Sequence, residues 1–248
     1  MKVITHHDFH EVYTKEPAAA PGRIEAILRA IQSDVTLEEA EPAGWDDIEA
    51  VHGRDHIDAV TQRSLYKIAA LAAGATIQAA VIGLSEPCFA LVRPPGHHAS
   101  ADSSWGFCYF NNMAVALDHL RRHNHIQTAY VLDFDLHYGD GTVNILKPKG
   151  YTAIHNPMAE HRGTYLKEVA SHLASAHADI IGVSAGFDNH FLDWGQVLHT
   201  EDYRELGMMV GETCLRLGIG CFAVLEGGYN HQVLGEALHA FLQGLQGR

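Results

Sequence analysis

The segment Ala129–Gly141 constrains the fold more than any other part of the chain. It begins with an apolar run that is too short for a helix and rich in strand-forming residues. Asp133, Asp135 and His137 follow at alternate positions, so in an extended chain they lie on one face. Unpaired carboxylates at the end of a buried strand are costly. A divalent cation would offset that cost, because Asp-x-His supplies ligands that zinc accepts. A polar strand end with a salt bridge is the alternative.

Composition predicts a single α/β domain spanning residues 1–248, since 47% of the residues are hydrophobic. Lys and Arg total 17 against 30 acids, for a formal charge of −13, and no basic cluster is present. Nucleic-acid binding is therefore not expected. The start of the chain does not resemble a signal peptide, and the apolar stretch Ile68–Leu84 contains Thr76 and Gln78, which favours a packed helix over a membrane span.

The cysteines are scattered along the chain, with no Cys-x-x-Cys pair: Cys88, Cys108, Cys214 and Cys221. This pattern is typical of reduced thiols in a cytoplasmic protein. The sequence leaves the oligomeric state open.

Strand and helix patterns alternate along the chain. Strands are expected at Lys2–Thr5, Cys88–Val92, Ala129–Asp133, Tyr151–His155, Asp179–Ser184 and Cys221–Leu225. Helices are expected near Arg23–Gln32, Asp55–Arg63, Tyr66–Leu84, Asn111–His123, Gly141–Leu146, Tyr165–His177, Thr200–Leu217 and Gln232–Leu242. The acidic segment Glu38–Asp47 contains Pro42 and Gly44 and is expected to be a surface connection. This order predicts a three-layer α/β fold, a mostly parallel sheet flanked by helices.

Four of the predicted strands lead directly into polar or glycine-rich sequence. The segments concerned are Arg93–His98, Asp135–His137, Ala185–Asp188 and Glu226–Asn230. The carboxyl ends of parallel strands meet at one edge, where open α/β sheets build their sites. This convergence favours the metal over the salt bridge. Asp135, His137 and Asp188 would give three protein ligands and leave an open position, as in a catalytic zinc site.

Groups for proton transfer are also present at this edge. His97 and His98 are candidates for the general base and the general acid. Tyr229, on a Gly-Gly turn, is a candidate for stabilising an oxyanion. Together with a metal that activates water, these residues predict hydrolysis of an amide.

The motifs resemble the zinc-dependent histone deacetylases of the arginase–deacetylase superfamily. The matching segments are R-P-P-G-H-H-A (Arg93–Ala99), G-F-C-Y-F-N-N (Gly106–Asn112), D-F-D-L-H-Y-G-D-G-T (Asp133–Thr142), S-A-G-F-D (Ser184–Asp188) and E-G-G-Y-N (Glu226–Asn230). They span about half of the chain, in the family's order. The resemblance implies a deacetylase with an arginase/deacetylase-like fold and zinc on Asp135, His137 and Asp188, with ferrous iron as an alternative metal.

The resemblance also implies two His–Asp pairs, His97 with Asp133 and His98 with Asp140. It further implies that Tyr229 stabilises the oxyanion, that Gly106 offers its carbonyl to the substrate amide, and that Phe107 walls the acyl channel. A potassium ion near Asp133 is a further implication, and Arg23 is a loose match to an arginine at the inner end of the channel.

The chain departs from the family in its substrate rim. The short segment between Arg63 and Ala69 lacks the expected aspartate, and residues 156–164 contain no clear counterpart of the loop that bears the second wall aromatic. The two-manganese arginases are a rival, but Gly139 occupies the position of a required aspartate, and Asp-x-Asp is missing at Asp188.

Several residues also have a purely structural interpretation. Core packing is the alternative for Phe107, Tyr109 and Phe110. For Trp105 and Trp194 packing is the default, and a position on the rim of the site is the alternative. We expect a structural role for His190.

Two functional hypotheses remain. The first is a deacetylase acting on an acetylated small amine, a polyamine or an acetyl-lysine side chain. The second, motivated by the shortened rim, is a catalytically weak protein that binds an acyl ligand or a partner.

Overall fold

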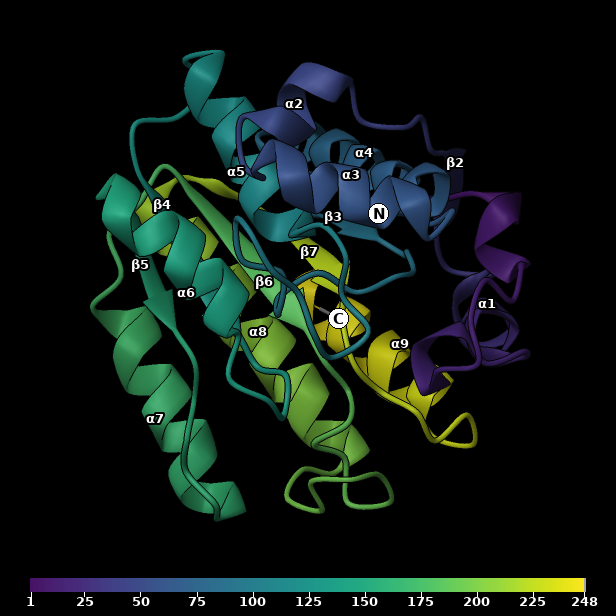
Figure 1. Ribbon diagram of the computed structural model, residues 1–248. Coiled ribbons are helices and arrows are strands. Elements are labelled where there is room, and N and C mark those ends of the chain that lie inside the picture. Colours follow the sequence, from purple (N-terminus) through teal and green to yellow (C-terminus); the bar gives the residue numbers. More distant parts are fainter. Residues whose placement is uncertain (248) are drawn as a thin grey trace.

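The computed structural model describes residues 1–247 and contains one seven-stranded sheet, ordered β2-β1-β3-β7-β6-β4-β5 (Figure 1). The strands are β1 (Lys2–Thr5), β2 (Thr36–Glu39), β3 (Cys88–Ala90), β4 (Ala129–Asp133), β5 (Thr152–His155), β6 (Ile180–Ala185) and β7 (Gly220–Leu225). Every pair of neighbouring strands is parallel. The predicted α/β fold is therefore confirmed, and the four strands that precede the motifs are neighbours at its centre.

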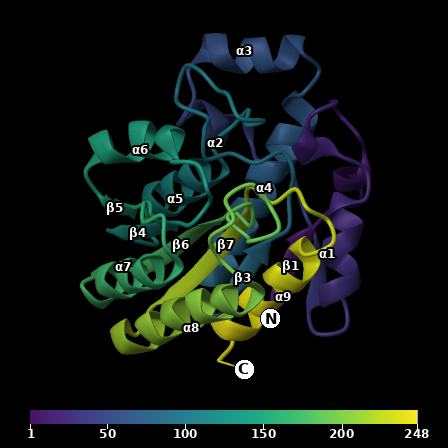
Figure 2. The ribbon, with the colours of Figure 1, turned by 90° about the horizontal axis from the view of Figure 1, so that it is seen from below.

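Helices cover both faces of the sheet. They are α1 (Arg23–Ile31), α2 (Trp45–Glu49), α3 (Arg54–Gln62), α4 (Tyr66–Gly83), α5 (Asn112–Arg122), α6 (Asp140–Leu146), α7 (Arg162–Ala174), α8 (Thr200–Leu217) and α9 (Leu234–Leu245). Figure 2 shows α7, α8, α9 and α1 along one face and α4 and α5 on the other. Helix α2 packs on α5, α3 on α4, and α6 on α5. The molecule thus has the predicted three layers.

The central strands form the core, because β3, β4 and β6 are buried along their whole length. Helix α4 is long and apolar enough to cross a membrane, but 67% of that segment is buried inside the fold, as expected for a packed helix. Helix α4 packs against β1, β3 and β7, and α5 packs against β6.

Two short elements were not predicted. The strand β2 pairs in parallel with β1 and includes Glu38 and Glu39, so the expected surface connection from Glu38 to Asp47 is wrong at its start. The sequence T-L-E-E has no apolar run because this edge strand is largely exposed, and its strand conformation comes from pairing with β1. Helix α2 lies in the second half of the same segment.

Candidate active site

The motif segments leave the carboxyl ends of four adjacent strands, β3, β7, β6 and β4. Asp135 and His137 follow β4, Asp188 follows β6, and Tyr229 follows β7. His98 lies in the long segment after β3. Parallel pairing brings these segments to one edge of the sheet, although up to 131 positions separate them in the sequence (229 − 98 = 131).

Asp135, His137 and Asp188 form a compact cluster. One potential ligand atom from each lies within 4.8 Å of the others. The Nδ1 atom of His137 is 3.4 Å from Asp135 Oδ1 and 3.3 Å from Asp188 Oδ2. Both carboxylates are buried, whereas the imidazole is partly exposed and lines a cavity. The structure thus brings together the residues that the sequence predicted as metal ligands.

The cluster fits a divalent cation. Asp188 Oδ2 is buried and accepts no hydrogen bond, which is costly for a carboxylate oxygen that has no ligand. The space beside it is kept open by Gly227, where a Cβ atom would lie 2.6 Å from the Oδ2 atoms of both Asp135 and Asp188. Two carboxylates and an imidazole are a donor set that zinc and ferrous iron both accept.

The pKa values of Asp188 and His137 are strongly shifted. Burial and the neighbouring charge of Asp135 raise the pKa of Asp188 to about 6. The hydrogen bond to Asp135 and the neighbouring carboxylate of Asp188 raise the pKa of His137 to about 10. Two carboxylates this close therefore need a positive charge between them, supplied by a proton on His137 or by a cation.

Three other clusters of potential metal ligands lie among residues 1–247, and two of them fit a cation less well. They are His6–His7–Asp8, His97–Cys108–Glu226 and His155–Glu168–His172. In the last of these the two imidazoles stack face to face at 3.7 Å and 8°, so their lone pairs do not converge. In the first, Lys67 already pairs with Asp8 at 2.9 Å.

Two histidine–carboxylate pairs lie beside the cluster. His97 Nδ1 is 3.1 Å from Asp133 Oδ2, and His98 Nδ1 is 2.8 Å from Asp140 Oδ1. A carboxylate on Nδ1 orients the ring and leaves Nε2 available for chemistry. These are the pairs that the family resemblance implied.

The two histidines differ in protonation. Burial disfavours a charge on His97, but the carboxylates of Asp135 and Asp133 outweigh it and raise the pKa well above its ordinary value. Burial and the nearby His97 lower the pKa of His98 to about 4, against the opposing effect of Asp140. The pKa values of the two imidazoles are thus shifted in opposite directions, which favours the charged form of His97 and the neutral form of His98.

A cavity of about 250 Å³ opens above these residues. Its lining is Pro95, His97, His98, Trp105, Gly106, Phe107, His137, Trp194, Gly227 and Tyr229. Phe107 therefore lines the site, whereas Tyr109 and Phe110 are buried in the core. Trp105 and Trp194 also line the cavity, so the default expectation of core packing is wrong for both.

Trp194, for which the sequence left a rim position as the alternative to packing, supplies an aromatic wall of the cavity. No residue of the segment 156–164 lines the cavity in the part of the chain that the structure describes. Trp194, from the loop after β6, instead stacks on Tyr229 with ring centroids 4.1 Å apart. His190, from the same loop, is buried and bonds to Thr200 Oγ1 at 3.1 Å, in keeping with the structural role expected for it.

The turn that presents Tyr229 is fixed from beneath by Arg23, which is fully buried. Its Nε donates to Gly228 O at 2.8 Å and its Nη2 to Glu226 O at 2.5 Å. The guanidinium also lies 5.5 Å from the centroid of the Tyr229 ring. Arg23 thus acts on the turn through the backbone, a function that the loose motif match could not reveal.

Asp193 and Glu226 are structurally important residues that the sequence did not single out. Asp193 Oδ2 accepts the N–H groups of Tyr229 and Asn230, each at 2.7 Å. Glu226, also fully buried, accepts the N–H groups of Gly96 and His97 at 2.7 and 3.2 Å. The position of Glu226 at the head of a motif was a usable signal, whereas Asp193 had none.

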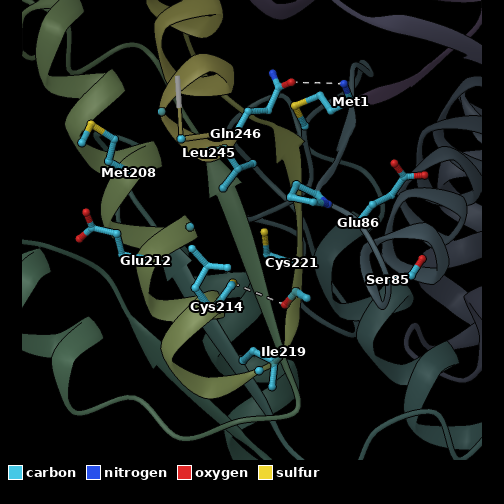
Figure 3. A pocket seen from close by; sticks show the side chains of 17 residues that line it. Met1, Ser85, Glu86, Met208, Glu212, Cys214, Ile219, Cys221, Leu245 and Gln246 are labelled. Carbon is cyan, nitrogen blue, oxygen red and sulfur yellow. Dashed lines mark hydrogen bonds between the residues drawn. The ribbon is translucent and has the colours of Figure 1, made fainter.

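A larger cavity of about 790 Å³ lies at the opposite end of the sheet, where Met1, Pro87 and Gly220 precede or begin strands β1, β3 and β7 (Figure 3). None of the four potential metal-binding clusters found among residues 1–247 contributes to its lining. Size alone therefore does not locate the active site, and the smaller cavity holds the chemistry.

Comparison with known proteins assigns the family. Residues 18–158 and 155–245 match the family model of the histone deacetylase domain, and the chain belongs to that family. A probable deacetylase of Methanothermobacter thermautotrophicus is 33% identical over 304 residues, covering 99% of this chain and 91% of that protein. Acetylpolyamine amidohydrolase 2 of Pseudomonas aeruginosa is 29% identical over 197 residues, covering 64% of this chain and 56% of that protein.

A solved structure supports the fold. The crystal structure of the HDA15 HD domain superposes with a TM-score of 0.86, covering 100% of this chain and 91% of that one. The two chains are 23% identical, so this likeness establishes the shared architecture alone.

Proposed function

We propose that the protein is a metal-dependent deacetylase that hydrolyses the N-acetyl amide of a small amine, a polyamine or a lysine side chain. The observation that carries the proposal is the buried Asp135–His137–Asp188 cluster, with its orphaned carboxylate oxygen, at the floor of a cavity lined by His97, His98 and Tyr229. Relatives named as a polyamine deacetylase of Homo sapiens and an acetylpolyamine amidohydrolase support an acylated amine as the substrate.

Asp135, His137 and Asp188 would hold the ion, with zinc favoured and ferrous iron as the alternative. When bound, such an ion supplies Lewis-acid polarisation of the amide carbonyl and lowers the pKa of water.

The proton transfers fall to the histidine pairs. Neutral His98 accepts the proton of the attacking water and returns it to the leaving amine. Charged His97, held by Asp133, favours the developing negative charge.

The substrate carbonyl is oriented by the cavity walls. Tyr229 lies beside Phe107 and Trp194, with centroid distances of 5.9 and 4.1 Å, and its hydroxyl donates to the oxyanion. Gly106 also lines the cavity, and its carbonyl accepts the substrate amide N–H. The tight turn between α3, ending at Gln62, and α4, starting at Tyr66, leaves no projecting loop to grip a peptide backbone. Small substrates should therefore react at least as well as long peptides.

The decisive experiment compares the wild type with Asp188→Ala and Asp188→Asn. Release of acetate is measured on acetylated polyamines, small N-acetyl amines and acetyl-lysine peptides, and bound metal is measured by elemental analysis. We expect about one ion per chain in the wild type, loss of the ion in Asp188→Ala, and loss of turnover with it. An exposed matched variant, Asp58→Ala on α3, should keep both.

Two results would contradict the proposal. Full turnover in Asp188→Ala, or after exhaustive chelation, would exclude a metal held by this cluster. Tight binding of an acetylated amine without any acetate release by the metal-loaded wild type would instead support the ligand-binding alternative.

A further inference from the structure

We propose that Trp105 is a positioning residue that holds the His98–Asp140 pair in its reactive orientation. The proposal rests on the proposed function and extends it to a residue outside the family motifs. Trp105 Nε1 donates to Asp140 Oδ2 at 2.9 Å, while His98 Nδ1 lies 2.8 Å from Asp140 Oδ1. One carboxylate oxygen of Asp140 is thus paired with the imidazole of His98, and the other accepts the indole N–H of Trp105.

The indole also contacts the imidazole directly. The rings of Trp105 and His98 stack with centroids 3.7 Å apart and planes 28° apart. The tryptophan therefore touches both members of the pair, through its ring face and through its N–H group. Contact with both members fixes the imidazole plane as well as the carboxylate.

The two histidine pairs differ in how they are supported. The side chain of Asp133 is fully buried, so the surrounding protein immobilises the His97 pair. The side chain of Asp140 is 36% exposed, and water would compete for its oxygens. In each pair a second donor binds the carboxylate oxygen that the histidine leaves free. For the buried Asp133 it is the backbone N–H of Asp135 at 3.3 Å, whereas for the exposed Asp140 it is the side chain of Trp105 at 2.9 Å.

The backbone directly after Trp105 adopts an energetically unfavourable conformation. Gly106 and Phe107 both have positive φ, +58° and +68°, and Phe107 is not a glycine. A Cβ at Gly106 would lie 2.3 Å from His98 Cδ2. This tight turn lets Trp105 reach Asp140 and His98 while Phe107 lines the cavity. Strained non-glycine backbone of this kind persists where the surrounding contacts impose it.

The test uses Trp105→Phe, which keeps an aromatic ring for stacking and removes the N–H donor. Loss of a hydrogen bond to a carboxylate should lower kcat about tenfold, with KM unchanged within about twofold. Trp45→Phe is the matched control, because Trp45 stacks on Tyr66 away from the cavity and makes no side-chain hydrogen bond among residues 1–247. It should leave kcat and KM unchanged.

A double-mutant cycle distinguishes an effect of Trp105 through Asp140 from a general disturbance of the site. If Trp105 acts through Asp140, adding Trp105→Phe to Asp140→Asn should cost less than about twofold more in kcat. Equal tenfold losses in both backgrounds would overturn the proposal. So would an unchanged kcat in the single variant.

A spectroscopic readout keeps the inference testable if the proposed function fails. The hydrogen-bonded Nδ1–H proton of His98, assigned by its absence in His98→Ala, is followed by NMR in the wild type and in Trp105→Phe. We expect a shift upfield and faster exchange with water in the variant. An unmoved resonance in a folded variant contradicts the inference, whereas absence of deacetylation by the wild type contradicts only the proposed function.

Discussion

The carboxylate of Asp193 accepts the backbone N–H of Tyr229 at 2.7 Å and so joins the loop after β6 to the turn after β7. The same oxygen accepts Asn230 N–H at 2.7 Å, and the other oxygen accepts Trp194 N–H at 2.8 Å. Asp193 is buried, so these bonds lie largely out of water. The loop that provides Asp188 and the turn that presents Tyr229 are thereby held as one unit.

Replacing Asp193 by Ala should uncouple the two segments. Three backbone N–H groups would lose their acceptor, and the free energy of unfolding should fall by about 3 kcal/mol. Because Tyr229 would lose its anchor, kcat should fall at least about tenfold. Chemical denaturation and steady-state kinetics measure the two effects. A lower free energy of unfolding with an unchanged kcat would show that Asp193 stabilises the fold without positioning Tyr229.

Tyr229→Phe should separate binding from catalysis. The phenyl ring can keep its stacking on Trp194, so binding of an acetylated amine should change by less than about twofold. Loss of the hydroxyl should lower kcat by about a hundredfold or more, the usual effect of removing one oxyanion donor. Calorimetry and turnover rates test this pair of expectations. A variant that still turns over at the wild-type rate would place the oxyanion donor elsewhere.

Arg23→Lys tests the support beneath the same turn. An ammonium group cannot reproduce the two directed bonds that the guanidinium makes to the carbonyls of Gly228 and Glu226. We expect a lower melting temperature and a kcat reduced about tenfold, because the turn would relax. Arg29→Lys, on the exposed side of the same helix, is the control and should match the wild type.

The unfolding free energy should depend on pH through His52, which lies far from the proposed ligands in the sequence. Its Nδ1 donates to Ser100 O at 3.0 Å and its Nε2 accepts Asn111 N–H at 2.9 Å, an arrangement that requires the neutral ring. Burial, together with neighbouring His56, lowers the pKa of His52 to about 4. The contribution of His52 to the free energy of unfolding is therefore fully present above about pH 6.5, the ordinary pKa of histidine. It is lost as the pH falls toward 4.

This contribution can be measured by urea denaturation at pH 7 and pH 5. Protonation of His52 in the unfolded chain should cost about 2 kcal/mol between these two values. His52→Asn, which does not titrate, should show a correspondingly smaller difference between the two pH values. An equal difference in both proteins would mean that other groups cause the acid sensitivity.

The central strands and their motifs were predictable from the sequence because burial on both faces produces continuous apolar runs. The strand Ala129–Asp133 was predicted with its observed bounds. The exposed edge strand Thr36–Glu39 was missed, because its sequence contains no such run and its conformation depends on pairing with β1. Helix ends shifted by up to three residues, as at α7 and α9, where capping and packing decide the boundary.

The residue types that meet at the candidate site were predictable from the sequence alone. Residue types at the ends of apolar strands specified two carboxylates and three imidazoles on one edge, since parallel strands end together. Only the tertiary structure decided what supports that chemistry. Trp105 reaches Asp140, and Asp193 reaches Tyr229, across 35 and 36 positions of sequence. No local pattern encodes such contacts, because they depend on how separate loops are placed relative to one another in the folded chain.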